Sequence, residues 1–251
     1  MRYLILSDIH ANWEALSAVL SHARRKKYEK VLFLGDAVGY GASPNAVMDW
    51  LRSIGSAGHS IRGNHDRVCS GLDSGEYFNA FALQAVHWTA DRLEDRNRKM
   101  LQELPEGPVF VEEQLAMCHG TPQDEDAYIF SGQEALQAFD VIPQQAIFFG
   151  HTHVPSVFIL GPQESQPDME VRLLVGERQR LRLEDGKRYL INPGSVGQPR
   201  DRDPRASYGI YDSQTRRFFH YRVTYPVAEA RRRIVRAGLP PMLGDRLLHG
   251  V

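Results

Sequence analysis

Short apolar runs that alternate with helical patterns constrain this chain most. Apolar runs at residues 3–6 and 31–34 each lead into a polar cluster, which is typical of buried strands. A third strand has a weaker pattern, with Ser60-Ile61-Arg62 leading into another polar cluster. Asn12 is a candidate N-cap for a helix after the first run. Ser43 and Pro44 form an N-cap and N1-proline pair that begins a second helix ending near Gly55. This strand–helix–strand–helix–strand order predicts an α/β fold with a parallel core.

The rest of the chain is richer in strand patterns. Residues 131–134 form a capping box that begins a short helix, and a longer helical stretch covers about 77–101. Pro226 begins a terminal helix that ends at Arg236, with Gly238 as its C-cap. The polar residues 161–169 are predicted to be a hairpin tip. Strands are expected at 109–111, 115–118 and 146–149, as consecutive antiparallel strands at 154–160, 170–175, 179–183 and 188–191, and as a last pair at 207–212 and 217–223.

We expect one domain over residues 1–251, built on two sheets. Residues of about 67–105 could form a helical cap that selects substrate, or a helix pair that simply packs on the core. The 30 Lys and Arg residues against 31 Asp and Glu give no bulk basic field that would indicate nucleic-acid binding. No apolar run approaches the roughly 20 residues that a membrane span needs. With only two cysteines, we expect a reducing compartment, the cytoplasm. The sequence leaves open whether the chain forms a homo-oligomer.

Metal-ligand residue types gather where the predicted strands end. One such cluster is usually an N-cap or a turn, but clusters at the ends of several strands of one sheet would share an edge. Imidazole and carboxylate ligands without cysteine suit Mn, Fe, Zn, Ni or Co. The seven ligands exceed what one tetrahedral ion needs, so two divalent ions sharing a carboxylate explain them better. The clusters are Asp8-x-His10, Gly35-Asp36, Gly63-Asn64-His65-Asp66, His119-Gly120 and Gly150-His151-x-His153.

These clusters, in this order, resemble the motifs of the calcineurin-like metallophosphoesterase superfamily, which are D-x-H, G-D, G-N-H-[DE], a later H, and G-H-x-H. The segment from Asn192 to Gly197 also looks like the asparagine-proline-glycine-serine loop of its small prokaryotic, phosphodiesterase-like members. The resemblance implies a four-layer α/β/β/α sandwich of two mixed β-sheets flanked by helices.

The resemblance also implies two metal sites, with manganese favoured for activity. Asp36 would bridge the two ions, and His65 would lie just outside them, facing the leaving group. One ion would be held by Asp8, His10, Asp36 and His153, and the other by Asp36, Asn64, His119 and His151.

This ligand set suits phosphate ester hydrolysis. Two ions about 3.5–4 Å apart turn a bridging water into hydroxide and neutralise the phosphoryl oxygens. Asn64 coordinates without reducing the positive charge offered to phosphate. His65 could protonate the leaving alkoxide or stabilise its charge, and general acids contribute roughly 10²–10⁴-fold. Asp66 could orient His65 or cap a helix.

Departures from the family bear on the substrate. Protein Ser/Thr phosphatases, which this chain resembles at Gly35-Asp36, have the motif G-D-x-V-D-R-G. This chain has Gly39 and Tyr40 in place of the second aspartate and the phosphate-binding arginine of that motif. Tyr40 could line the substrate site or pack in a turn. Arg200 and Arg205, in the loop after the Asn192–Gly197 segment, could replace the missing arginine or belong to a solvated turn. Arg67 is a weaker candidate.

The function we expect is metal-dependent hydrolysis of a small phosphoester, most simply a phosphodiester or a nucleotide, by a metal-bridging hydroxide. The alternatives are a protein phosphatase, a dinucleoside-polyphosphate phosphatase, and a non-catalytic binding scaffold on the same fold. The retromer scaffold subunit is an example of the last class, because it resembles this family but has lost catalytic groups. The complete ligand set together with His65 argues against the scaffold.

Overall fold

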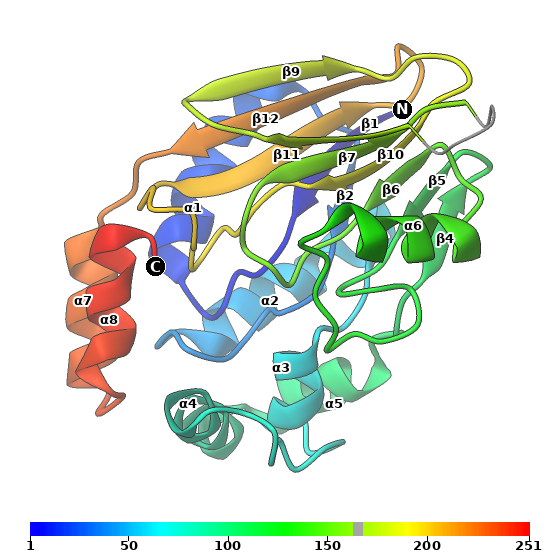
Figure 1. Cartoon of the computed structure of the whole chain (residues 1–251). Coiled ribbons are helices and arrows are strands. Elements are labelled where there is room, and N and C mark those ends of the chain that lie inside the picture. The colour runs from blue at the N-terminus through cyan, green and yellow to red at the C-terminus, as the bar shows by residue number, and fades with distance from the viewer. Residues whose placement is uncertain (163–167) are drawn as a thin grey trace.

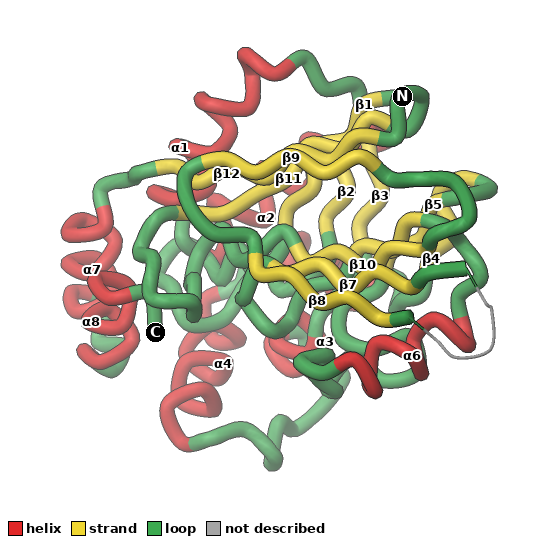
Figure 2. Tube along the Cα trace, turned by 45° about the horizontal axis from the view of Figure 1, so that its top comes forward, coloured by secondary structure: helices red, strands yellow, loops and turns green. Residues whose placement is uncertain are grey.

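The computed structural model of the chain describes residues 1–162 and 168–251. Its strands form two six-stranded sheets, which face each other as the two central layers in Figure 2. The first sheet has the order β3-β2-β1-β11-β12-β9, and the second has the order β4-β5-β6-β10-β7-β8. The predicted hairpin tip at 161–169 falls mostly on residues outside the described part of the chain.

The first sheet begins with the predicted parallel core. β1 pairs in parallel with β2, and β2 with β3, while β11 pairs antiparallel with β1. Crossover helices between the parallel strands satisfy the connection rule for such sheets. Its strands are β1 (Arg2–Leu6), β2 (Lys30–Phe33), β3 (Gly58–Ser60), β9 (Arg178–Arg182), β11 (Ala206–Asp212) and β12 (Arg217–Val223).

The second sheet is also mixed: β10 pairs in parallel with β6 and antiparallel with β7. One expectation is wrong here, because the four strands from 154 to 191 do not pair consecutively. β8 pairs with β7, but β9 crosses to the first sheet and pairs with β12. Alternating residues define a strand but not its partner, so the crossing was invisible in the sequence. The strands are β4 (Val109–Glu112), β5 (Leu115–Met117), β6 (Ala146–Phe148), β7 (Ser156–Leu160), β8 (Met169–Leu173) and β10 (Arg188–Asn192).

Three apolar layers separate the sheets and helices. In β1, Tyr3 and Ile5 pack between the two sheets, while Leu4 and Leu6 pack against the helices that cover the first sheet. This follows from the two-residue period of a strand. A third cluster joins the outer face of the second sheet to α6 (Gly132–Val141). The four-layer α/β/β/α sandwich is therefore confirmed (Figure 1).

The helices on the first sheet begin and end largely where the sequence indicates. The Asn12 side chain accepts a hydrogen bond from the Ala15 N–H, as an N-cap should. Ser43 does not cap α2 with its side chain, and its Oγ instead accepts a hydrogen bond from Arg233. These helices are α1 (Trp13–Ala23), α2 (Pro44–Ile54), α3 (Asn64–Cys69), α4 (Ala80–Arg92), α5 (Asp95–Glu103), α7 (Val227–Arg236) and α8 (Pro241–His249), with 3-10 turns at Arg24–Lys26 and Gly55–Ala57.

The predicted helix over 77–101 is two helices, because the chain becomes extended at Leu93 and Glu94. Asn45 of α2 holds this break: its Nδ2 donates to the Arg92 carbonyl, and its Oδ1 accepts from the Glu94 N–H. A side chain about fifty positions away thus supplies hydrogen bonds that helix continuation would otherwise provide.

The sequence interpretation also missed a helix at the end of the chain. α7 ends before Gly238, which has φ +77° as its predicted C-cap role requires. Pro241 then begins α8 rather than closing the structure. A proline is tolerated at the first helical position because its missing N–H has no partner there.

Within the described residues, every helix is too short or too polar to cross a bilayer. Cys69 and Cys118 are both buried free thiols.

Candidate metal centre

The predicted metal ligands meet at one end of the two sheets. Asp8 and Asp36 follow β1 and β2, Asn64 begins the helix after β3, and His119 and His151 follow β5 and β6. Backbone hydrogen bonds join the loops: the Asp8 N–H donates to Gly35 O at 3.0 Å, and the His10 N–H donates to Asp36 O at 3.0 Å. Parallel strands thus bring ligands from distant parts of the sequence to a common edge.

Asp8, His10, Asp36 and His153 form the first group of possible ligands. Their ligand atoms all lie within 4.8 Å of one another, and all four residues are buried. His10 Nε2 lies 3.1 Å from His153 Nε2, and His153 Nε2 lies 3.4 Å from Asp8 Oδ1. Nitrogen and oxygen donors that converge in this way are suited to a divalent ion.

Asp36, His119 and His151 form the second group, within the same 4.8 Å limit. Asp36 belongs to both groups, and its Oδ2 lies 3.5 Å from His10 Nε2 and 3.5 Å from His119 Nε2. Asn64 is buried nearby and lines the same pocket as Asp36 and His151. The structure therefore brings all seven predicted ligands together around a shared carboxylate.

Backbone carbonyls orient the histidines. Nδ1 of His10 is 3.0 Å from Val38 O, Nδ1 of His119 is 2.7 Å from Leu34 O, and Nδ1 of His153 is 2.6 Å from Gln198 O, which leaves Nε2 of each ring for an ion. His151 is reversed, because its Nε2 is 3.0 Å from the Asp126 carbonyl and only Nδ1 remains available. Such outer contacts fix ring orientation and tautomer at metal sites.

The Asn192–Gly197 loop supports the first loop of the site. Asn192 Nδ2 donates to Gly150 O at 2.7 Å, and Ser195 Oγ donates to Asp8 O at 2.8 Å. The loop therefore positions the chain around Asp8 and Gly150.

Five of the seven candidate ligands have left-handed backbone conformations. The φ angles are +53° at Asp8, +49° at His10, +59° at Asp36, +63° at His151 and +59° at His153. Asp and His enter this region more readily than most residues, but it remains uncommon outside glycine. Such conformations gather at functional sites, where the surrounding structure offsets their cost.

Buried polar atoms without partners indicate that the cluster fits cations. Within residues 1–162 and 168–251, four atoms of the cluster are buried and have no hydrogen-bond partner: Asp8 Oδ2, Asp36 Oδ2, Asn64 Oδ1 and His119 Nε2. Each unsatisfied buried group costs about 1–3 kcal/mol. All four can donate an electron pair, so divalent ions would satisfy them.

The pKa shifts of the cluster also indicate that it fits cations. Burial would raise the pKa of Asp36, but the charges of His119 and His65 outweigh it and hold that pKa well below its ordinary range. Burial would lower the pKa of His119, but Asp36 raises it to about 10. Burial lowers the pKa of His10 to about 4 and raises that of Asp8 to about 7. A bound ion would replace the proton of His119, so metal binding should release protons.

His65 lies beside the cluster among aromatic rings. Its ring centroid is 4.4 Å from that of Tyr40, 4.6 Å from that of Phe78 and 4.8 Å from that of His10. Its backbone N–H donates to Asp36 Oδ1 at 2.9 Å, and burial lowers its pKa well below the ordinary value. Nδ1 faces Gly39 and is buried with no hydrogen-bond partner in the described part of the chain, which leaves Nε2 as the nitrogen for a ligand.

A pocket of about 180 Å³ opens on the cluster. Tyr40 and Arg200 line it, as the sequence suggested, and the Arg200 guanidinium carbon lies 5.9 Å from the centre of the Tyr40 ring. Arg205 is not among the lining residues and binds Asp203 with Nε and Nη2 instead. Asp66 caps α3 by accepting a hydrogen bond from the Gly63 N–H.

Arg67 is held in an ion-pair network beside the pocket. It contacts Glu125 at 2.5 Å and Asp126 at 2.6 Å, and it donates to the Tyr77 hydroxyl at 2.6 Å. Because its charge is balanced by carboxylates, its evident task is to join α3 to the loops that carry Asp126 and Tyr77.

The sequence interpretation missed the aromatic wall of the pocket. Tyr128 stacks on His151 with ring centroids 4.1 Å apart, and Tyr77 and Phe78 enter from the loop before α4. Tyr77 is 53% exposed and Tyr128 is 42% exposed, so both present ring surface to solvent. Tyr128 lies in a segment without strand or helix periodicity, and Tyr77 stands at the start of the predicted helical stretch but precedes α4 in the structure. Only their aromatic character could have drawn attention to them.

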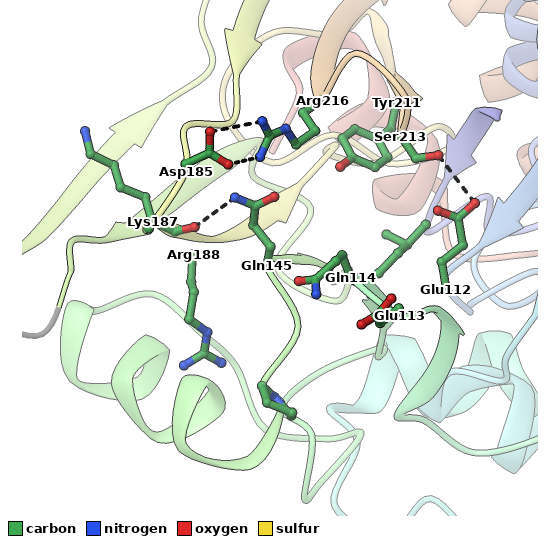
Figure 3. Close-up of a pocket in the computed structure, with 13 residues that line it drawn as sticks. Glu112, Glu113, Gln114, Gln145, Asp185, Lys187, Arg188, Tyr211, Ser213 and Arg216 are labelled. Carbon is green, nitrogen blue, oxygen red and sulfur yellow. Dashed lines mark hydrogen bonds and ion pairs between the residues drawn. The ribbon is translucent and has the colours of Figure 1, made fainter.

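A larger cavity, of about 680 Å³, lies elsewhere, at the ends of β4, β5 and β10 (Figure 3). Its side chains largely satisfy one another: Arg216 pairs with Asp185, and Ser213 donates to Glu112. None of the residue groups able to hold a metal, within the ranges described, lies there.

Comparison with known proteins agrees with this geometry. A model of the calcineurin-like phosphoesterase superfamily domain matches residues 1–216. The uncharacterized protein MJ0912 of Methanocaldococcus jannaschii is 36% identical over 252 residues, covering 98% of this chain and 97% of the relative.

Solved structures are similar over the full length. The crystal structure of a metallophosphoesterase from Sphaerobacter thermophilus has a TM-score of 0.85 at 35% identity and covers 100% of both chains. The hypothetical protein PH1004 from Pyrococcus horikoshii shares the fold, with a TM-score of 0.78 at 19% identity over 100% of this chain and 98% of its own. On these matches the chain belongs to the calcineurin-like phosphoesterase superfamily, and it is a metal-dependent phosphoesterase.

Proposed function

We propose that this protein hydrolyses small phosphodiesters or nucleotides with two divalent ions, manganese being the most effective. Asp8, His10, Asp36 and His153 would hold one ion, and Asp36, Asn64, His119 and His151 the other. The observation that carries the proposal is Asp36, a buried carboxylate shared by two ligand groups whose Oδ2 has no hydrogen-bond partner in the described chain. When bound, a pair of ions supplies an activated water and neutralises phosphoryl charge.

The residues of the chain would complete the reaction. His65 Nε2 would donate a proton or a hydrogen bond to the leaving oxygen, while the rings of Tyr40 and Phe78 hold the imidazole in place. Arg200, which lines the pocket without a carboxylate partner in the described residues, would bind a phosphoryl oxygen.

The pocket favours a small substrate over a phosphoprotein. Its volume of about 180 Å³ suits a phosphoryl group and little more. Tyr40 also occupies the motif position at which phosphoprotein phosphatases have arginine. We infer that the segment of about 67–105 helps to select substrate, because Tyr77, Phe78 and Asn79 from it line the pocket. Its helices also pack on the core, since Ala85 and Leu101 are fully buried there.

We also propose that the protein acts in the cytoplasm. The support is that both cysteines are buried thiols, which a reducing compartment would preserve.

Turnover of p-nitrophenyl phosphate and bis-p-nitrophenyl phosphate tests the function. We expect hydrolysis with Mn²⁺, faster for the diester, and its loss in Asp36→Ala. His65→Ala should lower kcat by about 10²–10⁴-fold for a poor leaving group such as phenyl phosphate, and less for p-nitrophenolate. His87→Ala, at an exposed position on α4, is the matched control.

Failure to hydrolyse either ester with Mn²⁺, Fe²⁺, Zn²⁺, Ni²⁺ or Co²⁺ would reject the enzyme. Full activity of His65→Ala on phenyl phosphate would reject only the role of His65.

A further inference from the structure

A second groove adjoins the pocket of the metal centre. It has a volume of about 540 Å³ and lies between the start of α4 and helix α8. Tyr40 and Asn79 line both the groove and the pocket, so the two spaces share a wall. Ligand sites usually occupy about 300–1,000 Å³, so the groove can hold the body of a substrate that the smaller pocket cannot. The other lining residues are Phe81, Met242, Leu243, Asp245, Arg246, His249 and Val251.

Two guanidinium groups lie near this shared wall. Arg200 comes from the loop after β10 and lines the pocket, while Arg246 comes from α8 and lines the groove. The Arg200 guanidinium carbon lies 5.9 Å from the centre of the Tyr40 ring, and Tyr40 lines the groove together with Arg246, so both cations approach the same ring. Burial, and then the charge of Arg200, lowers the pKa of Arg246, which agrees with this placement. Like charges held together in a partly buried place favour an anion between them.

Neither arginine has a carboxylate side chain within 4.0 Å in the residues that the structure describes. Arg200 donates to Gln198 Oε1 at 3.1 Å, and its buried Nε has no partner there. Arg246 donates through Nε to a main-chain oxygen of Val251, the last residue of the sequence, at 2.6 Å, and its Nη1 and Nη2 remain for a ligand. Asp245, the acidic residue nearest in sequence, pairs with Arg231 at 2.6 Å.

The fold holds the two arginines in place. The Arg202 N–H donates to the Gly250 carbonyl at 2.8 Å, which ties the loop carrying Arg200 to the end of α8. A second tie runs from this loop to the first sheet, where Arg222 pairs with Asp201. An anion site on two supported elements needs little ordering when its ligand binds.

The groove also has an apolar part, beside the polar side chains of Asn79, Asp245 and His249. Phe81 and Met242 are 45% and 42% exposed, and they lie on facing elements, α4 and α8. An exposed aromatic ring beside a flexible thioether offers a flat surface on which a base can stack.

We propose that Arg200 and Arg246 form a second anion subsite, and that the substrate is a nucleotide with two separate phosphate groups. One phosphate would be hydrolysed at the metal centre. The other would bind Arg246 from the groove and Arg200 from the pocket, so that Arg200 would contact both phosphates, and the base would lie on Phe81 and Met242. In the reaction, the oxygen of water bonds to phosphorus, the ester P–O bond breaks, and the leaving oxygen takes a proton. The proposal rests on the proposed function for the hydrolytic step only.

Binding to the metal-free protein tests the subsite without turnover. By calorimetry, adenosine 3′,5′-bisphosphate should bind at least tenfold more tightly than adenosine 5′-monophosphate. Arg246→Gln should abolish this preference, Arg246→Lys should keep part of it, and Arg232→Gln on exposed α7 should leave it intact. Equal affinities in the unsubstituted protein, or an unchanged preference in a folded Arg246→Gln, would overturn the proposal.

Kinetics separate the two hypotheses. With Mn²⁺, Arg246→Gln should raise KM for the bisphosphate at least tenfold and leave the hydrolysis of p-nitrophenyl phosphate within twofold. Normal turnover of p-nitrophenyl phosphate without that rise in KM would overturn the subsite and leave the proposed function standing. Bisphosphate preference in calorimetry without hydrolysis of any ester would reject the proposed function and support the subsite.

Discussion

Gly39 packs directly against His65: a β-carbon on Gly39 would lie 2.5 Å from Nδ1 of the His65 ring. Gly39 also has φ +85°, a conformation that side chains rarely adopt. The glycine that replaces the second aspartate of the phosphatase motif is therefore required by the position of His65 in this chain. An aspartate could not be restored here without moving the imidazole.

Gly39→Ala should consequently lower kcat by about tenfold or more, because the added methyl displaces the group that faces the leaving oxygen. It should also lower the free energy of unfolding by about 1–2 kcal/mol, owing to the positive φ. Steady-state kinetics and urea unfolding measure the two effects. Gly176→Ala is the matched control, because Gly176 has φ +84° and its β-carbon would meet nothing nearer than 4.0 Å. If both variants kept full activity, Gly39 would not be positioning His65.

The number of metal ions bound per chain should depend on Asp36, because both ligand groups include this carboxylate. We expect two ions per chain in the unsubstituted protein, about one in His119→Ala, which belongs to one ligand group, and almost none in Asp36→Ala. Metal analysis after dialysis gives the numbers. Added Mn²⁺ should raise Tm of the metal-free protein and should not raise that of Asp36→Ala, since an ion that binds only the folded state stabilises it. One ion retained by Asp36→Ala would show that the carboxylate does not bridge.

His220, which is not among the candidate metal ligands, makes stability depend on pH. It is fully buried, its Nε2 lies 2.7 Å from Ser207 Oγ, and burial lowers its pKa from 6.5 to about 3. The unfolded chain then binds more protons than the folded chain between these values, so this contribution is complete above pH 6.5 and is lost as the pH falls. Relative to pH 7, the loss at pH 5 should be about 2 kcal/mol.

The measurement is urea unfolding at pH 7, 6 and 5 for the unsubstituted protein and for His220→Gln, which should show a shallower decline. His87→Gln, at an exposed position, should decline as the unsubstituted protein does. Equal slopes for all three proteins would contradict the assignment to His220.

Ala11 has a left-handed backbone, with φ +52°, which glycine adopts more readily than alanine. Ala11→Gly loses a buried methyl but removes about 1–2 kcal/mol of backbone strain, so its free energy of unfolding should stay within about 0.5 kcal/mol of the original. Ala15→Gly, in the helical conformation and equally buried, should lose about 1–2 kcal/mol. Urea unfolding compares the two. An equal loss in both variants would mean that Ala11 is not strained.

The chemistry of the site was readable in the sequence because it resides in residue types at the ends of apolar runs. Asp8, Asp36 and His119 each follow a strand that the period of apolar residues predicts, and parallel pairing makes such ends meet. The N-cap of α1 and the capping box of α6 were readable for a similar reason, since each depends on hydrogen bonds between residues three positions apart.

Only the tertiary structure decided the contacts between segments that are distant in the sequence. The crossing of β9 to the first sheet, the break that Asn45 imposes at Leu93, and the stacking of Tyr128 on His151 leave no periodic trace in the sequence. The placement of Arg246 beside Tyr40, in the groove that adjoins the pocket of Arg200, depends on how α8 packs. Local sequence patterns determine which metal ligands this chain can offer. The packing of loops and helices determines the shape and charge of the space around these ligands, because shape and charge depend on distances that only the folded chain fixes.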